Sequence, residues 1–217
     1  YLADPANPSK DLVRFHYRDR EDMFDMVTYS KGGRILNMLR NYVGDSAFFK
    51  SLNLYLSRHK FGNAEAQDLR LAFEEVTGQD LNWYWNQWYY GSGHPRLDIH
   101  YFYDDAKKTA LVTVDQTQGT GKIFRVPLFI DVYEGSSKIR HKVWLHSAAD
   151  SFYFSYHNRP DLINVDGDKI VLCEKKDAHP LAPFILPSRH AELYLDSRVA
   201  IDFCAKHQDN PAALDLL

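Results

Sequence analysis

The 217-residue sequence contains few cysteines, no long apolar run and no excess of positive charge. Cys173 and Cys204 are its two cysteines and lie in different predicted modules, so they indicate neither a disulfide framework nor a zinc-finger spacing, and the redox compartment stays open. No apolar run approaches the roughly 20 residues of a membrane span, and no basic-then-apolar leader opens the sequence. A formal net charge of -3 argues against nucleic-acid binding. We expect a soluble globular chain, without membrane contact, whose localisation and oligomeric state the sequence does not reveal.

Both ends of the sequence lack the features of natural termini. The chain begins with Tyr1 instead of an initiator methionine, and it stops at Leu217, shortly after Asn210-Pro211 has opened a helix. We therefore expect a fragment of a larger protein. A frayed natural C-terminus is the alternative.

Apolar residues recur at helical spacing from residue 29 to about 90, which predicts four amphipathic helices joined by short turns. Gly44 and Gly78 are predicted to end the first and third helices, and Asp80 to cap the fourth. The predicted apolar faces contain Ile35, Met38, Leu39 and Tyr42; Phe48, Leu52, Tyr55 and Leu56; Leu69, Ala72, Phe73 and Val76; and Leu81, Tyr84, Trp85 and Trp88.

After Gly91-Ser92-Gly93-His94-Pro95 the apolar period changes from helical spacing to two. Alternating residues and regularly spaced turns predict about seven strands between about 96 and 177, with a hairpin turn at 134–137. We interpret them as an antiparallel β-sandwich. The strand signals include Leu97, Ile99 and Tyr101; Val112 and Val114; Val126, Leu128, Ile130 and Val132; and Phe152, Phe154 and Tyr156.

Helical signals return after Pro187, so the predicted fold class is a multi-module α + β chain: a four-helix block, an antiparallel β-sandwich and the start of a helical repeat domain. The predicted boundaries are 1–94 for the helical block, 95–178 for the sandwich and 179–217 for the start of the repeat domain.

Residues 24–33, Phe-Asp-Met-Val-Thr-Tyr-Ser-Lys-Gly-Gly, are followed by a predicted helix from Ile35. This segment resembles the F-D-x-x-x-Y-x-K-G-A motif of the aminopeptidase N family, which are gluzincin zinc metallopeptidases. The resemblance extends through Asp68-Leu69 and Gln87-Trp88 to Gly93-His94-Pro95, and so covers most of residues 24–95. It implies that 1–94 is the C-terminal helical part of a catalytic domain. The family's order, a β-sandwich and then a HEAT-like helical domain, agrees with the order predicted from periodicity.

The resemblance implies a catalytic role for Tyr29. When water attacks a peptide carbonyl group, negative charge collects on the carbonyl oxygen, and a fixed hydrogen-bond donor aimed there lowers the barrier. A phenol stays protonated at neutral pH and suits this task. The alternative is a half-buried structural tyrosine with its hydroxyl bonded to backbone.

Three neighbours of Tyr29 belong to the same motif. Lys31 either orients nearby carboxylates or is a solvated lysine at the helix start, and the second interpretation is favoured. Gly32 is expected to let the helix approach a neighbour closely, because a helical glycine is otherwise unfavourable. Gly33 replaces the family's alanine, which should loosen the helix start.

The ligands that hold zinc in the family are missing from this sequence. The family's site requires H-E-x-x-H on a helix and a further glutamate about 18 residues later. None of the ten histidines has another at i+4. The G-x-M-E-N segment that holds the substrate's amino group is also missing. We therefore expect zinc and peptide substrates only in a parent aminopeptidase whose ligands lie upstream, with the fragment inactive alone.

Other functions remain open. A non-catalytic relative that binds peptides or proteins would have a degenerate zinc motif upstream, and epoxide hydrolase activity occurs in one branch of the family. A carbohydrate-binding module would use exposed rings, for which Trp83 and Tyr90 are candidates, whereas Trp85 and Trp88 are predicted to be core.

Overall fold

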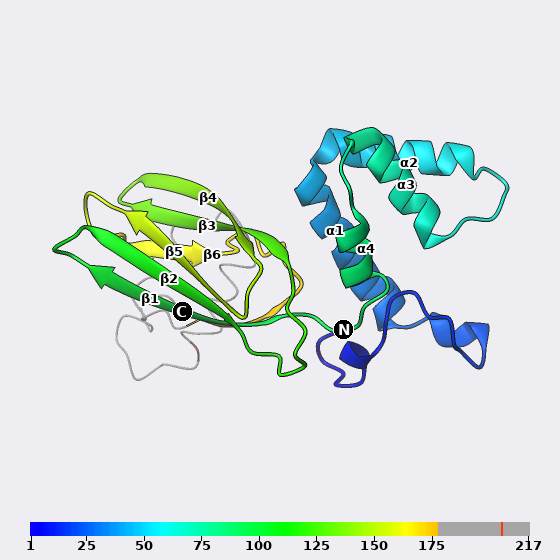
Figure 1. Ribbon diagram of the computed structural model, residues 1–217, viewed down its shortest axis with the longest axis horizontal. Coiled ribbons are helices and arrows are strands. Elements are labelled where there is room, and N and C mark those ends of the chain that lie inside the picture. The colour runs from blue at the N-terminus through cyan, green and yellow to red at the C-terminus, as the bar shows by residue number, and fades with distance from the viewer. Residues whose placement is uncertain (178–204, 206–217) are drawn as a thin grey trace. The chain divides into compact units, whose positions relative to one another are not determined.

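The computed structural model of the protein describes residues 1–177 and Ala205. The chain divides into two compact units, Tyr1–Pro95 and Arg96–Leu217, and Figure 1 shows helices in the first and strands in the described part of the second. The predicted helical module at 179–217, with Cys204, falls outside the described residues except for Ala205. None of the described helices is long and apolar enough to cross a membrane.

The first unit is helical, as the 3.6-residue period predicts. Each of its four longer helices lies where the sequence predicts one. The unit contains η1 (Asn7–Ser9), η2 (Arg20–Met23), a π-helical turn η3 (Val27–Lys31), α1 (Gly32–Val43), α2 (Asp45–Arg58), α3 (Ala66–Thr77) and α4 (Asn82–Trp88).

Backbone chemistry explains where these helices stop and start. Gly44 has a φ of 84° between α1 and α2, and Gly78 has a φ of 66° after α3, a region that favours glycine. The Asp80 carboxylate accepts a hydrogen bond from the backbone N–H of Asn82 at 2.8 Å, at the start of α4. The predicted glycine stops are therefore confirmed, whereas the N-cap position of α4 is occupied by Leu81 and Asp80 binds the first turn from one residue earlier.

Aromatic residues of α4 form the centre of the helical unit. Trp85 stacks on Tyr89 with ring centroids 4.7 Å apart, and its indole N–H donates to the Ala66 carbonyl at 2.9 Å. The hydroxyl of Tyr84 donates to the Ile35 carbonyl at 2.7 Å, which connects α4 to α1. Because Trp85 and Trp88 are both buried, their predicted place in the core is confirmed.

Two side chains of this unit differ from the expectation. The sequence predicts Leu56 on the apolar face of α2, but its side chain is 65% exposed. Ser51, a polar residue of the same helix, is instead completely buried. The hydroxyl of Ser51 donates to the Ala47 carbonyl at 2.8 Å, so a small polar residue is satisfied within its own helix and can face the core. The ring of Trp83 is half-buried and meets the rings of Tyr42 and Tyr84 edge-on.

The described part of the second unit contains two sheets. A four-stranded sheet has the order β5-β2-β1-β7, and a three-stranded sheet has the order β4-β3-β6. The strands are β1 (Arg96–Asp104), β2 (Thr109–Gln116), β3 (Val126–Glu134), β4 (Ser137–Leu145), β5 (Ala149–Ser155), β6 (Leu162–Val165) and β7 (Glu174–Asp177). The predicted hairpin is present, because Glu134 pairs with Ser137 across a turn in which Gly135 has a φ of 58°.

Alternation along the strands places one face of each sheet in the core. Buried positions include Leu97, Ile99, Val112 and Val114 in one sheet and Val126, Leu128, Ile130 and Val132 in the other. One strand pair in the predicted antiparallel sandwich is parallel. The short strand β7 pairs parallel to β1, with Arg96 opposite Glu174 and Ile99 opposite Asp177. Alternation within a strand reports which face is buried and not the direction of its neighbour.

A buried carboxylate joins β3 to β4 and to the loop after β6. Arg140 donates to both oxygens of Asp131 at 2.7 Å and also contacts Asp168 at 2.6 Å and 2.9 Å. Gly167 lets this loop close over the pair, because a Cβ atom there would lie 3.0 Å from Asp131 Oδ2 and 3.1 Å from Asn164 Nδ2. With a Cβ atom there, the side chains of Asp131 and Asn164 would have to move by a few tenths of an ångström, and the ion pair with Arg140 resists that movement of Asp131.

We predict that Gly167→Ala destabilises the sandwich by about 1–3 kcal/mol, because the added methyl group overpacks the site around Asp131. Gly33→Ala is the matched control: a Cβ at Gly33 meets nothing within 4 Å, so it should stabilise α1 by up to about 1 kcal/mol. Amide hydrogen exchange, followed separately for the two units during urea unfolding, measures both effects. A Gly167→Ala protein as stable as the parent would contradict the packing argument.

Candidate functional site

Tyr29 lies in the middle of the π-helical turn η3 and points toward solvent. Its side chain is 62% exposed, while Val27 and Lys31 in the same turn are buried. The backbone N–H of Gly32 donates to the Val27 carbonyl, which is the i→i+5 bond of a π turn. The phenol ring lies near Phe24, with ring centroids 6.3 Å apart. Turns of this kind occur often at functional sites.

The hydroxyl group of Tyr29 has no hydrogen-bond partner among the residues that the structure describes. The structural alternative, a half-buried tyrosine bonded to backbone, therefore does not describe this residue. An exposed donor is available to a ligand from outside the unit.

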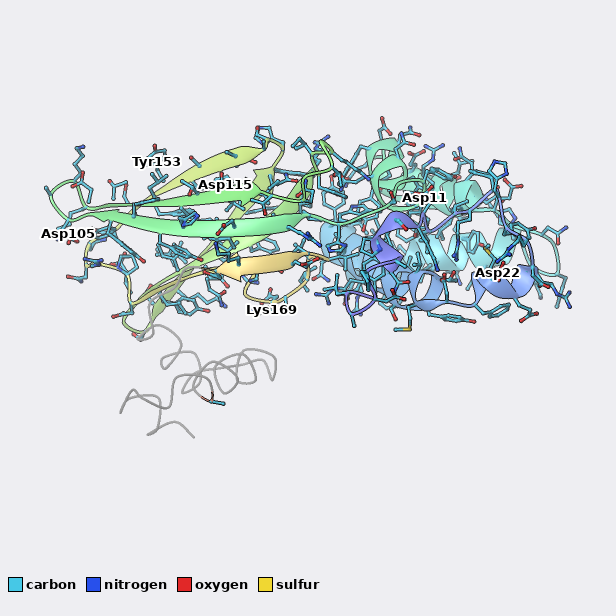
Figure 2. The ribbon with its side chains drawn as sticks, turned by 90° about the horizontal axis from the view of Figure 1, so that it is seen from below. Asp11, Asp22, Asp105, Asp115, Tyr153 and Lys169 are labelled. Atoms are coloured by element: carbon cyan, nitrogen blue, oxygen red, sulfur yellow. The ribbon has the colours of Figure 1, made fainter. Side chains whose placement is uncertain are left out.

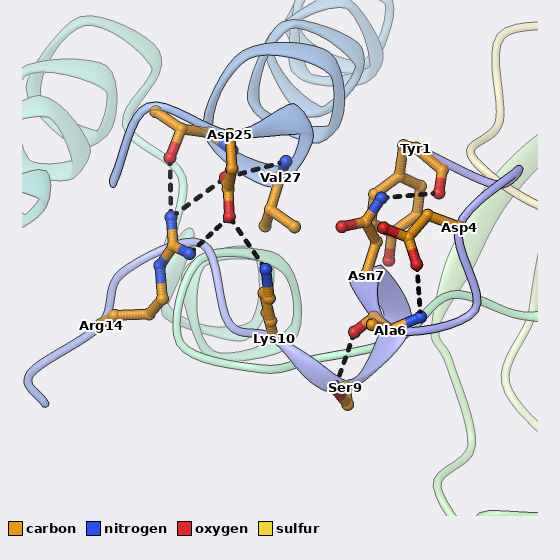
Figure 3. A network of polar contacts seen from close by, with 10 residues as sticks. Tyr1, Asp4, Ala6, Asn7, Ser9, Lys10, Arg14, Asp25 and Val27 are labelled. Carbon is orange, nitrogen blue, oxygen red and sulfur yellow. Dashed lines mark hydrogen bonds and ion pairs between the residues drawn. The ribbon is translucent and has the colours of Figure 1, made fainter. Parts of the chain in front are cut away.

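The start of η3 is fixed by Asp25. One carboxylate oxygen accepts the backbone N–H groups of Val27 at 3.0 Å and Thr28 at 2.9 Å. Arg14 reaches both carboxylate oxygens, at 2.7 Å and 3.2 Å, and also donates to the Thr28 hydroxyl at 2.8 Å. Lys10 adds a longer contact at 3.3 Å (Figure 3). The carboxylate thus satisfies N–H groups that have no carbonyl partner at a helix start.

Charge and burial act in opposite directions on Asp25. Desolvation raises the pKa of its carboxyl group, but the hydrogen bonds and charge of Arg14, the Thr28 amide and Lys10 together hold that pKa well below its usual range. The carboxylate is therefore ionised at neutral pH. The segment that carries Arg14 is itself attached to the end of α4, because the Val13 N–H donates to the Tyr89 carbonyl at 2.9 Å.

Lys31 is not the solvated lysine that the sequence favours. Its side chain is completely buried, and its ammonium group donates to the Gly91 carbonyl at 3.0 Å. The residue therefore connects the end of η3 to the segment that follows α4. Lysine is rarely found fully buried, so composition and position alone favour the wrong interpretation.

The two glycines after Lys31 have different surroundings. A Cβ atom at Gly32 would lie 3.5 Å from a methyl group of Leu12, an ordinary van der Waals distance, so the expected need for close approach is wrong. Gly33 is exposed and also tolerates a Cβ.

A shallow depression of about 590 Å³ opens beside this turn. Its wall mixes basic, acidic and aromatic side chains. Lys10, Arg14, His16, Tyr17, Arg18, Glu21, Asp22, Met23, Phe24 and Asp25 line it. Tyr29 is not part of the wall and adjoins it through Phe24. Asp22, labelled at the right of Figure 2, lies on η2.

The described residues do not fit a metal centre. Within residues 1–177, no group of three histidine, cysteine or carboxylate side chains is placed to hold a metal ion. Zinc, which the resemblance implies for the parent, cannot be assigned to the residues around Tyr29.

Comparison with known proteins identifies the helical unit. Residues 4–88 match the model of the peptidase family M1 domain. We refer to these residues, which are similar to the peptidase M1 family, as the M1 segment. The M1 segment therefore includes Tyr29, Asp25 and Lys31 and ends at the last residue of α4.

Relatives of the M1 segment are aminopeptidases and related proteins. The chain is 40% identical over 84 residues to aminopeptidase N of Streptomyces lividans, covering 37% of the chain and 10% of that protein. It is 30% identical over 143 residues to tricorn protease-interacting factor F2 of Thermoplasma acidophilum, covering 60% of the chain and 18% of that protein. The chain thus spans less than a fifth of either relative.

A solved structure shows the same fold. The crystal structure of Legionella pneumophila aminopeptidase A in complex with aspartic acid has a TM-score of 0.79 and 14% sequence identity. The match covers 99% of this chain and 27% of the Legionella chain. The α + β fold predicted from the sequence is therefore confirmed.

We predict that acid weakens the M1 segment through Asp25. The pKa of Asp25 is lower in the folded protein than in the unfolded chain, where it is about 4. The ionised network therefore contributes its full stability above about pH 4, and this stability is lost as the pH falls from there through the pKa of the folded protein. The stability of wild-type protein relative to Asp25→Asn should shrink over this range. Hydrogen exchange of α1 amides at several pH values measures it, and a pH-independent difference would rule out the effect.

Proposed function

We propose that this chain forms part of an aminopeptidase that removes N-terminal residues from peptides, and that Tyr29 stabilises the transition state of that reaction. The observation that carries the proposal is the exposed phenol of Tyr29, in an M1 segment, on a π-helical turn held by Asp25 and Lys31. In this proposal residues 1–94 are the C-terminal helical part of the catalytic domain, and 95–178 are a separate sandwich domain.

The chemistry assigned to Tyr29 is hydrogen-bond donation. As a peptide carbonyl carbon becomes tetrahedral, its oxygen gains negative charge, and a donor already in place stabilises that charge without reorganisation. The hydroxyl of Tyr29 is free to turn toward such an oxygen, since no described residue binds it. The phenol keeps its proton throughout, so Tyr29 acts as a donor and not as an acid or base.

The zinc of the proposed enzyme is assigned to polypeptide other than the described residues of this chain. Those residues provide no metal-ligand cluster. Peptide substrates, the metal and the attacking water all belong to the complete enzyme. The contribution of this chain is one wall of the site.

We predict that Tyr29→Phe lowers kcat of the complete peptidase at least about a hundredfold, equivalent to about 3 kcal/mol, with little change in KM. The phenyl ring keeps the packing against Phe24 and removes only the hydroxyl group. Steady-state hydrolysis of an aminoacyl p-nitroanilide measures both constants. A loss of less than about threefold would remove Tyr29 from the mechanism.

Tyr153→Phe provides the matched control for this substitution. Tyr153 is 70% exposed on β5 of the sandwich, where Figure 2 shows its side chain at the surface, so the same hydroxyl is lost at a similarly exposed position outside the M1 segment. Its kcat and KM should equal those of the parent enzyme.

We predict that the 217-residue chain by itself is inactive, with or without added zinc, because it lacks the H-E-x-x-H motif. The measurement is the same hydrolysis assay on purified chain, with Tyr29→Phe run in parallel to expose contaminating peptidases. Turnover that is lost in Tyr29→Phe would show that the isolated chain is a peptidase in its own right.

A further inference from the structure

The π-helical turn η3 is attached at both ends to segments distant in the sequence. At its start, Asp25 binds the turn's first amides and is itself held by Arg14 and Lys10. At its end, the buried ammonium of Lys31 binds the Gly91 carbonyl, 60 residues away. Val27, whose carbonyl accepts the i→i+5 bond, is completely buried. Tyr29 lies between these attachments and is exposed, as are Met26 and Ser30.

We propose that Asp25 and Lys31 are positioning residues: they hold the π-helical turn in register and so fix the direction in which Tyr29 presents its hydroxyl group. The aromatic ring has one weak neighbour, Phe24, and the hydroxyl has no described partner, so side-chain contacts do little to orient it. Its direction is set mainly by the backbone. A π turn is rare and exists where surrounding contacts maintain it.

The two attachments differ in strength and chemistry. At Asp25 the bidentate Arg14 contact is charge-assisted and also fixes the Thr28 hydroxyl, so it defines the rotation of the first turn. At Lys31 a buried cation donates to the Gly91 carbonyl, and a buried cation is costly to leave unsatisfied. Loss of either attachment would let the turn relax toward an ordinary α-helical register.

The catalytic consequence of this proposal rests on the proposed function of Tyr29, but the geometry is testable without it. Amide hydrogen exchange by NMR on the 217-residue chain reports the turn directly. The informative amides are those of Tyr29 and Gly32, because they donate to backbone carbonyls and not to the substituted side chains. The Gly78 amide, bonded to Glu74 in α3, is the reference within the same unit.

We expect exchange at Tyr29 and Gly32 to rise about tenfold in Asp25→Ala, which removes both the charge and the acceptor, and about threefold in Asp25→Asn, which keeps an acceptor. Lys31→Met keeps the apolar stem and loses the amine, and should also accelerate both amides. Exchange at Gly78 should stay constant. Unchanged exchange at Tyr29 and Gly32, or an equal rise at Gly78, would overturn the proposal.

Asp45→Asn is the matched control. Asp45 forms a bidentate pair with Arg40 at 2.8 Å and 2.7 Å in the same unit, but the pair is exposed and does not contact η3. The same chemical change there should leave exchange at Tyr29 as in wild type. Should Lys31→Met not fold, the two Asp25 variants still decide whether the start of the turn is held as proposed.

Kinetics of the complete peptidase separate this proposal from the proposed function. If both hold, Tyr29→Phe and Asp25→Asn each lower kcat with KM unchanged, the second by about tenfold, while Asp45→Asn changes neither constant. If Tyr29→Phe leaves kcat intact, the proposed function fails and the exchange results stand. If Tyr29→Phe lowers kcat but Asp25→Asn does not, the positioning role fails.

Discussion

The organisation of the candidate site depends on the carboxylate of Asp25. This one group closes the start of the π-helical turn, forms ion pairs with Arg14 and Lys10, and attaches the irregular N-terminal segment to the helical core. Backbone amides at a helix start need acceptors, and a guanidinium group needs a planar anion. A single ionised carboxylate meets both needs. The position of Tyr29, four residues later, depends on this arrangement.

The regular elements of both units follow from local sequence. Apolar spacing locates α1 to α4, glycines at positive φ separate them, and period-two alternation identifies the inward faces of the strands. Pairing between distant strands carries no such local signal. The apolar pattern therefore did not predict the parallel pairing of β7. It also did not predict the exposure of Leu56, which depends on what packs against the end of α2.

The candidate site was predictable only in part. A motif of ten residues points to Tyr29. Arg14 and Lys10 lie 11 and 15 residues before Asp25, in a segment without periodicity, so no sequence signal joins them to the carboxylate. Lys31 misleads because lysines are usually solvated, whereas here a carbonyl from a remote segment satisfies the amine. Residues that act through tertiary contacts need coordinates to be found.

The parallel pairing of β7 with β1 has a mechanical consequence. Arg96 begins β1 and Asp177 ends β7, the last strand that the structure describes, and the two strands lie side by side in the same direction. Tension applied between these two residues would slide the two strands past each other along their length. All hydrogen bonds of the pair would then bear the force at the same time, instead of breaking one after another. The sandwich thus resists extension between its entry and exit points better than a terminal hairpin would.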